Sequence, residues 1–324
     1  MAKKKVVEVE EPTHFAGYLI YKPGMRLSGG ARSVRWRGHL IVVPPLPDHL
    51  ESYSWVCREV LETASTWANP DPGYFRGQAV IGVHNISPDC DVLSPAPSDR
   101  ICFECQDGFF LHTTTLKSAK VTLPFTEFQM RVLERLKVAP SQLHLGAWAF
   151  IRGFERACFL FGRSEPSYKL FFYLFEVQRT PGLDGKGLVS LKGRKHHVFQ
   201  PFSDTYKDFK ENYFKVAAVE GKVPFWVLPN RSGNKFPLSW SPDHFGTKAK
   251  DYSLNSERDL EAEDLTLLRL FEKLVGSFGD KPIKIADILR YGVEDVRDGF
   301  VLKLSEFLLS SPINLKRMVM FVYL

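Results

Sequence analysis

Two cysteines, Cys102 and Cys105, have the spacing of half a zinc site, because thiolates separated by two residues can bind one tetrahedral metal ion. Cys90 or His112 could supply further ligands. The chain has no second paired motif, and apolar residues flank the pair, which favours the alternative that both cysteines are small core residues. The sequence therefore predicts no metal site and no cofactor.

Two further segments have residue types that act in catalysis. The glycines from Gly182 to Gly187 follow an apolar run as in a phosphate-binding loop, but Thr180 replaces the first glycine of that motif. Gly187 also stands where the motif needs a Ser or Thr, so we predict a turn. His196 and His197 are adjacent and would point to opposite faces of a strand, so they cannot share one site on a strand face.

Carboxylates that could hold catalytic metal ions gather between Glu257 and Asp264. They stand at the start of an expected helix, where negative charge interacts favourably with the helix dipole. The strand-like runs contain no isolated carboxylate, and the sequence has no hydrolase or protease motif. We therefore predict no catalytic residues and a protein that is not an enzyme.

Basic residues interleaved with aromatic ones form two stretches that could bind RNA or DNA, because cations neutralise phosphates and rings stack on bases. One lies in a basic N-terminal arm, residues 1–39, that we expect to be flexible, and the other begins at Lys192. The alternative is that these charges form an ordinary solvated surface. The candidate nucleic-acid-binding residues are Arg26, Arg32, Arg35, Trp36, Arg37, Lys192, Arg194 and Lys195.

Composition narrows the class of protein. The 324 residues are 44% hydrophobic and 25% charged, with a net charge of +6, which suits a globular protein and is compatible with a nucleic-acid partner. No apolar run approaches the roughly 18 residues that cross a bilayer, and the first residues lack the apolar segment of a signal peptide. Five scattered cysteines are too few for a disulfide framework. We expect an intracellular protein with reduced thiols and no membrane partner.

The aromatic-rich segment from Leu123 to Val177 is expected to position most of the core as three short helices. Pro124 suits the first turn of the first helix, and Ser141 is expected to cap the second helix through its hydroxyl. The third, Pro166 to Phe175, is apolar on nearly every side, so we expect it at the centre of the domain.

The remaining pattern predicts an α+β fold, predominantly helical, with a small antiparallel sheet and a C-terminal helical extension. We expect one principal domain over residues 40–250, the extension over 251–300 and an apolar tail over 301–324. Further helices are expected at 50–67, 260–275 and 283–291, strands at 40–43, 79–84, 188–191, 197–199, 213–219 and 225–228, and an exposed connection at 87–98.

The order and spacing of four segments resemble the gypsy-type transposon domain family of plants, sometimes labelled transposase. The segments are Leu123–Thr126, Val138–His144 with the Trp-bearing helix after it, Lys207–Val216 and Phe236–Trp240, and the resemblance covers about residues 50–240. It implies a product of a domesticated or decaying transposon, a gag-like structural or interaction protein that self-associates. The alternatives are a sequence-tolerant nucleic-acid-binding protein and a metal-dependent transposase or nuclease.

Overall fold

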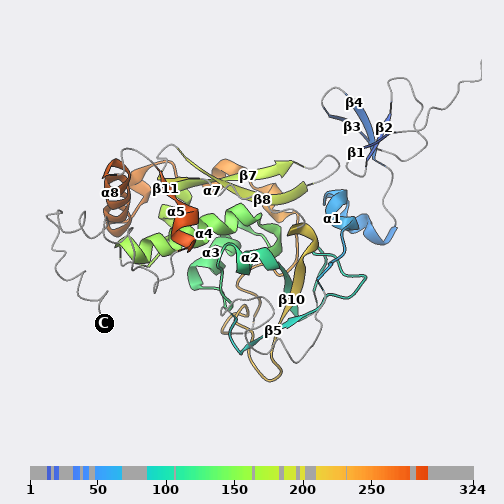
Figure 1. The fold of residues 1–324 in the computed structure, drawn as a ribbon, viewed down its shortest axis with the longest axis horizontal. Coiled ribbons are helices and arrows are strands. Elements are labelled where there is room, and N and C mark those ends of the chain that lie inside the picture. Colours follow the sequence, from blue (N-terminus) through green and yellow to red (C-terminus); the bar gives the residue numbers. More distant parts are fainter. Residues whose placement is uncertain are drawn as a thin grey trace, which may run out of the picture.

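Helices and small sheets occur together, so the predicted α+β class is correct (Figure 1). For the described residues up to residue 49, and for a few described positions elsewhere, the backbone alone is described. The computed structural model describes residues 13–15, 18–21, 32–36, 39–43, 48–67, 86–105, 107–162, 165–181, 186–194, 198–200, 209–230, 232–277 and 282–290.

Two antiparallel sheets account for most of the described strands. The first has the order β1 (Thr13–Phe15), β2 (Tyr18–Tyr21), β4 (His39–Val43), β3 (Arg32–Trp36), so β1 to β3 lie within the predicted arm. The second has the order β5 (Cys90–Leu93), β10 (Tyr213–Ala218), β6 (Gly108–His112), with Val216 paired to both Val92 and Phe109. The small antiparallel sheet predicted around 213–219 is therefore present. The strand predicted at 79–84 lies outside the described residues.

The connection predicted at 87–98 was wrong, because residues 90–93 form strand β5. Cys90 and Val92 are buried against the core, while Leu93 is exposed. This short alternation stands between prolines and serines that dominate the local composition. A strand was also predicted at 225–228, where one isolated bridge joins Val227 to Asn234 instead.

Three helices form within the aromatic-rich segment, as predicted: α3 (Glu127–Leu136), α4 (Leu145–Ala157) and α5 (Tyr168–Leu174). The predicted starts of two were wrong. Pro124 precedes α3, whose cap is Thr126: its hydroxyl accepts from the Gln129 amide, and the Gln129 side chain accepts from the Thr126 amide. The cap of α4 is His144, not Ser141.

The helix predicted at 50–67 was also wrong. A 3-10 helix spans Asp48–Tyr53, and α1 is limited to Arg58–Glu62. Cys57 between them has the extended backbone of a helix cap, with φ of −66° and ψ of 142°, so a continuous helix is interrupted.

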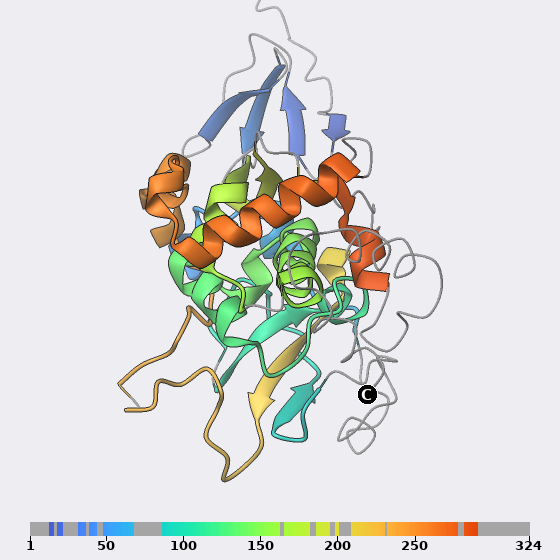
Figure 2. The same ribbon diagram turned by 90° about the vertical axis from the view of Figure 1, so that its left-hand side faces the viewer.

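The C-terminal elements pack on the same core as the central helices. Figure 2 shows α8 (Ala262–Ser277) lying across the helices behind it, and its Phe271 ring contacts Phe154, Phe161 and Phe199. The helix predicted at 260–275 is therefore present within two residues at each end. Residue Ile283 begins β11 (Ile283–Lys284), which pairs in parallel with β9 (Phe199–Gln200) before α9 (Ile285–Arg290).

The remaining elements are short. Strands β7 (Phe175–Pro181) and β8 (Lys186–Gly193) form a hairpin. The other helices are α2 (Thr113–Lys117), α6 (Asp243–Gly246) and α7 (Ala249–Tyr252), and a π-helical turn at Cys158–Gly162 follows α4. Among the helices that the structure describes, none combines the length and apolar character needed to cross a membrane.

Candidate functional site

A cavity of about 120 Å³ lies where the end of α3, the start of α5 and the segment around α7 meet. Its lining combines two cationic side chains with three aromatic rings and one leucine. These residues are Arg135, Tyr168, Lys169, Phe172, Tyr252 and Leu254. Cations bind anionic groups and aromatic faces bind planar rings, so this lining suits a ligand that has both.

Helix α5 places Tyr168 and Lys169 at the rim of the cavity. The Ser167 hydroxyl caps this helix by accepting from the amides of Lys169, at 3.2 Å, and Leu170, at 3.4 Å. Tyr168 is 37% exposed. The ammonium group of Lys169 lies 2.5 Å from Oε1 of Glu261, and this hydrogen bond and the carboxylate charge raise the pKa of Lys169.

Tyr252, which forms part of the cavity wall, is buried and is held in place by His244 and by the end of α3. Its ring stacks on His244 with 5.3 Å between centroids and 10° between planes. Its hydroxyl donates to the Leu136 carbonyl oxygen at 3.4 Å, and Nδ1 of His244 lies 2.8 Å from the same oxygen. The last turn of α3 therefore fixes the orientation of this ring.

The lining residue Leu254 is held by Arg194, one of the predicted nucleic-acid-binding residues. The Leu254 amide donates to the Phe172 carbonyl oxygen at 3.2 Å, and the Arg194 guanidinium donates to the Leu254 carbonyl oxygen. The guanidinium also donates to Oδ1 of Asn255 at 2.7 Å. Arg194 thus supports the cavity wall through its donors.

Arg135 stands in the last turn of α3 and is exposed. Its side chain makes no hydrogen bond or ion pair with any described residue, in contrast to Lys169. A cation at this end of a helix is favoured by the helix dipole, which accounts for its position without a ligand. Its unengaged guanidinium nevertheless leaves a bidentate donor at the cavity mouth.

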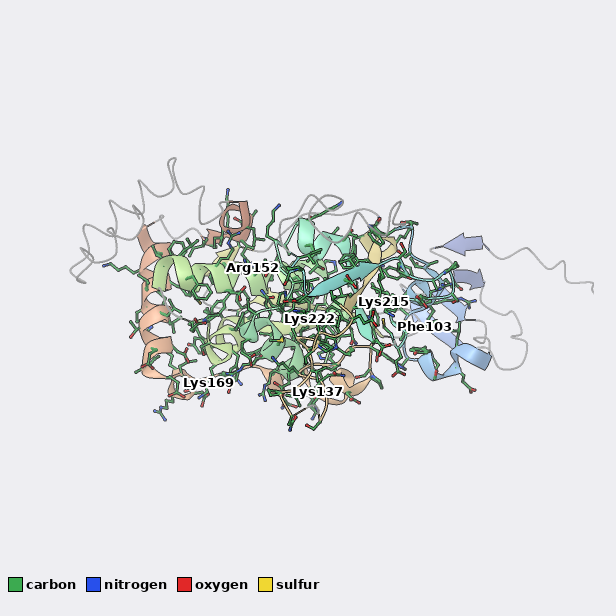
Figure 3. All side chains as sticks on the ribbon, turned by 90° about the horizontal axis from the view of Figure 1, so that it is seen from below. Phe103, Lys137, Arg152, Lys169, Lys215 and Lys222 are labelled. Atoms are coloured by element: carbon green, nitrogen blue, oxygen red, sulfur yellow. The ribbon has the colours of Figure 1, made fainter. Side chains whose placement is uncertain are left out.

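Further cations lie on the segments that contribute to the lining. Figure 3 shows Lys137 and Lys169 at the same edge of the molecule. Lys137 follows α3, and Lys248 and Lys250 come from the segment that includes Tyr252. The segments that line the cavity thus carry exposed lysines as well as aromatic side chains.

The other predicted site residues are not brought to this cavity. Lys192 on β8 lies with its ammonium group 2.7 Å from Glu176 on β7. Arg32, Arg35 and Trp36 belong to β3, where only the backbone is described. Arg26, Arg37 and Lys195, like His196 and His197, lie outside the described residues.

The five cysteines are buried and unlinked. Burial raises the pKa of Cys102 to about 12 and that of Cys90 and Cys105 to about 11, so these thiols are protonated at neutral pH. Cys102 and Cys105 belong to a core cluster that also contains Cys57. No group of three or more His, Cys, Asp or Glu side chains suited to a metal ion occurs within the described ranges.

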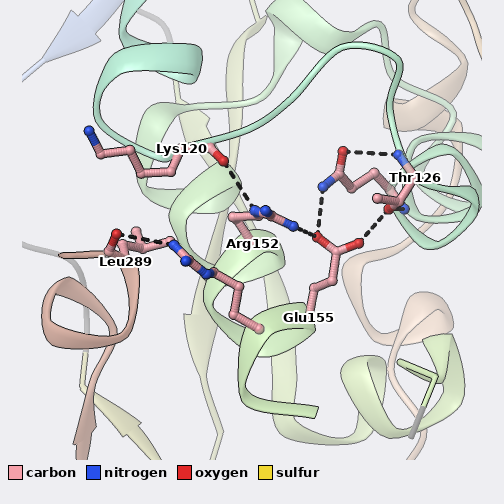
Figure 4. Close-up of polar contacts among 7 residues, drawn as sticks. Lys120, Thr126, Arg152, Glu155 and Leu289 are labelled. Carbon is pink, nitrogen blue, oxygen red and sulfur yellow. Dashed lines mark hydrogen bonds and ion pairs between the residues drawn. The ribbon is translucent and has the colours of Figure 1, made fainter. Parts of the chain in front are cut away.

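A buried carboxylate on α4 belongs to a separate polar cluster, drawn in Figure 4. Glu155 is 1% exposed and accepts from the Thr126 hydroxyl at 2.5 Å, from Nε2 of Gln129 at 2.8 Å and from Arg152 at 2.6 Å. Arg152 also donates to the Lys120 carbonyl oxygen at 3.1 Å. These contacts join α4 to the start of α3 and satisfy both carboxylate oxygens, which is a structural role.

A buried histidine lies beside the central sheet. Nδ1 of His112 is 2.9 Å from the Phe209 carbonyl oxygen, and Nε2 has no hydrogen-bond partner among the described residues. Burial lowers the pKa of His112 to about 4, although the main chains of Phe209 and Ser141 favour the protonated ring. The imidazole is therefore neutral at physiological pH.

No family model, curated protein or solved structure matches this chain.

The sequence did not reveal the cavity, because its six lining residues come from three segments that are far apart in the chain. The sequence around each lining residue indicated only its secondary structure. Arg135 lies at a helix end, Tyr168 in an apolar helix and Tyr252 in a polar connection. The interleaving of cations and aromatic residues indicated candidate nucleic-acid-binding residues in the arm and from Lys192 onward, and of these Arg194 contacts the lining residue Leu254.

Proposed function

We propose that this protein is a non-enzymatic structural or interaction protein, a gag-like product of a plant gypsy-type element. The observation that supports an interaction role is the pair of exposed aromatic side chains beside α8. Phe159, in the turn after α4, is 44% exposed, and Tyr168 at the start of α5 is 37% exposed. Both elements contact α8. Aromatic residues are enriched at protein interfaces, so this end of the molecule suits self-association.

We propose a predominantly helical domain over residues 40–250, with a helical extension over 251–300 whose described helices pack back on the same core. The protein is proposed to act inside the cell without a cofactor. The gag-like assignment is supported by the resemblance over about residues 50–240. A metal-dependent transposase or nuclease lacks a supporting observation and is not proposed.

Light scattering and sedimentation over a range of protein concentrations test this role. We expect reversible self-association that Phe159→Ser weakens at least about five-fold, because it removes an aromatic contact. Val223→Ser is the matched control, since Val223 is also apolar and exposed, at 60%, but lies after β10. A wild-type chain that stays monomeric at high concentration contradicts the proposal.

A second function, sequence-tolerant binding of nucleic acid, is supported by the cavity that joins Arg135 and Lys169 to aromatic rings. Fluorescence anisotropy with labelled single-stranded RNA and duplex DNA tests it at low and near-physiological salt. Phosphate-driven affinity must fall steeply as salt rises. At either salt concentration, charge reversal in the arm, by Arg32→Glu with Arg35→Glu, is expected to weaken binding relative to the wild type. The absence of binding at both salt concentrations contradicts this function.

A further inference from the structure

We propose that the cavity between α3, α5 and α7 binds one unpaired base of a single-stranded nucleic acid, with the adjoining phosphate at Arg135. This inference rests on the second proposed function and assigns it a site. The lining provides both of the groups that such a ligand needs, aromatic faces and a cation.

The size of the cavity restricts the ligand. An enclosed volume of about 150 Å³ in another protein accommodates benzene, so about 120 Å³ here accepts one ring that remains partly outside. Larger ligands usually occupy pockets of about 300 Å³ or more. A pyrimidine that enters edge-first, with its sugar outside, is therefore the expected occupant.

The aromatic side chains of the lining differ in exposure. Phe172 and Tyr252 are buried, at 1% and 3% exposed, so they close the cavity and offer little accessible ring surface to a base. Tyr168 is 37% exposed at the rim, where its ring can meet an entering base. Because Tyr252 and Leu254 are already held by hydrogen bonds, little ordering is required on binding.

Of the two cations that line the cavity, Arg135 is the one whose charge is available to a phosphate. Arg135 has no ion-pair partner among the described residues, and a guanidinium binds phosphate oxygens bidentately. Lys169 is engaged by Glu261, whose carboxylate would repel a phosphate. The phosphate is therefore assigned to Arg135.

A single strand fits this arrangement better than a duplex. The bases of a duplex are paired and stacked, and extruding one of them costs a few kcal/mol. A partner peptide with acidic and aromatic side chains is the competing occupant, and the experiment below separates the two.

The test uses the full chain with three labelled probes in anisotropy titrations. The probes are a ten-nucleotide oligouridylate, an abasic oligonucleotide with the same number of phosphates, and a peptide of alternating Glu and Tyr. The variants are Arg135→Gln and Tyr168→Ala. Arg131→Gln is the matched control, because it removes the same charge one turn earlier on α3, outside the cavity lining.

We expect Arg135→Gln and Tyr168→Ala each to weaken oligouridylate binding about five- to ten-fold, as loss of one phosphate contact or one stacking contact would. Arg131→Gln should change it less than about two-fold. Tyr168→Ala should leave the abasic probe unaffected, since that probe has no base to stack. Glu261→Gln should strengthen oligouridylate binding, because it removes the repulsive carboxylate.

Other results overturn the inference in distinguishable ways. If oligouridylate binds the wild type but Tyr168→Ala and Arg135→Gln bind as tightly, nucleic-acid binding stands and this site is wrong. If oligouridylate does not bind at all, both the function and the site fail. If only the peptide binds, and Arg135→Gln abolishes it, the occupant is a protein. Thermal unfolding of each variant shows whether it is folded. Tyr168→Phe, which keeps the ring, should bind oligouridylate as tightly as the wild type does.

Discussion

The Glu155 carboxylate of α4 accepts a hydrogen bond from the Gln129 side chain of α3 at 2.8 Å, and both side chains are buried. Gln129 also closes the capping box that starts α3. One side chain thus links the cap of one helix to a charge inside the next. The start of α3 and the last turn of α4 are fixed together by this contact.

Replacing the carboxylate by an amide in Glu155→Gln should lower the free energy of unfolding by about 3 kcal/mol. The change leaves Arg152 without its ion-pair partner. The new side-chain amide also brings an N–H donor against the Gln129 and Arg152 groups, which are themselves donors. Urea denaturation measures the loss. Glu134→Gln, an exposed change on α3, should stay within about 0.5 kcal/mol of the wild type. Equal stability of the two variants would refute a structural role for the buried charge.

Gly153 should be intolerant of a methyl group although it lies within a helix. A Cβ atom there would stand 2.9 Å from Cγ2 of Ile285 on α9. Gly153→Ala is therefore expected to cost about 2 kcal/mol of unfolding free energy despite the better helix propensity of alanine.

The matched control for that change is Gly276→Ala on α8, where an added Cβ meets nothing within 4 Å. It should stabilise the protein by about 0.5 kcal/mol. Adding Ile285→Ala to Gly153→Ala should cost less than the sum of the single changes, because the second removes the clash. Additive losses would show that the close contact is not the cause.

Acidification should destabilise the protein through His112. Its pKa is about 4 when folded and about 6.5 when unfolded, so between these values the unfolded chain binds a proton that the folded chain does not. The effect is absent above pH 6.5, grows as the pH falls and is complete near pH 4. At pH 5 it amounts to about 2 kcal/mol.

Unfolding free energies of wild type and His112→Gln at pH 7 and pH 5 check this effect. The variant should lose about 2 kcal/mol less between the two pH values. Nearby His144, whose pKa burial also lowers, contributes a dependence of the same sign that remains in both proteins. An identical loss in both proteins would exclude His112 as the source.

The thiols should react with a disulfide reagent only after unfolding. Burial raises the pKa of Cys102 to about 12, so neither access nor the thiolate is available in the folded state. Labelling at pH 8 should be slow without denaturant and should reach five equivalents in guanidinium. Zinc release measured with a colorimetric chelator tests the alternative, since stoichiometric metal would contradict the expected absence of a metal site.

The sequence predicted the helices whose apolar stripes are long, because burial on one face imposes a 3.6-residue period. Phe128, Val132 and Leu136 show this stripe on α3. It did not predict His144 as a cap, since histidine has no strong preference for that position. The Thr126 cap, with Gln129 three residues later, was readable as a capping box.

The elements that were mispredicted are short and depend on tertiary contacts. Strand β5 has four residues, and its partner β10 lies more than 100 residues later in the chain. Composition within the segment therefore indicated a loop. The cavity has the same origin, since Arg135 and Tyr252 meet only because the segment around α7 folds against the end of α3.

The pairing of Phe199 with Ile283 and the contact of Gly153 with Ile285 have a consequence during protein synthesis. Phe154 and Phe199 are covered by Phe271 of α8, which is translated much later. Until α8 and α9 leave the ribosome, the nascent chain exposes aromatic surface that attracts chaperones and other unfolded chains. Completion of the core therefore waits for translation beyond residue 290.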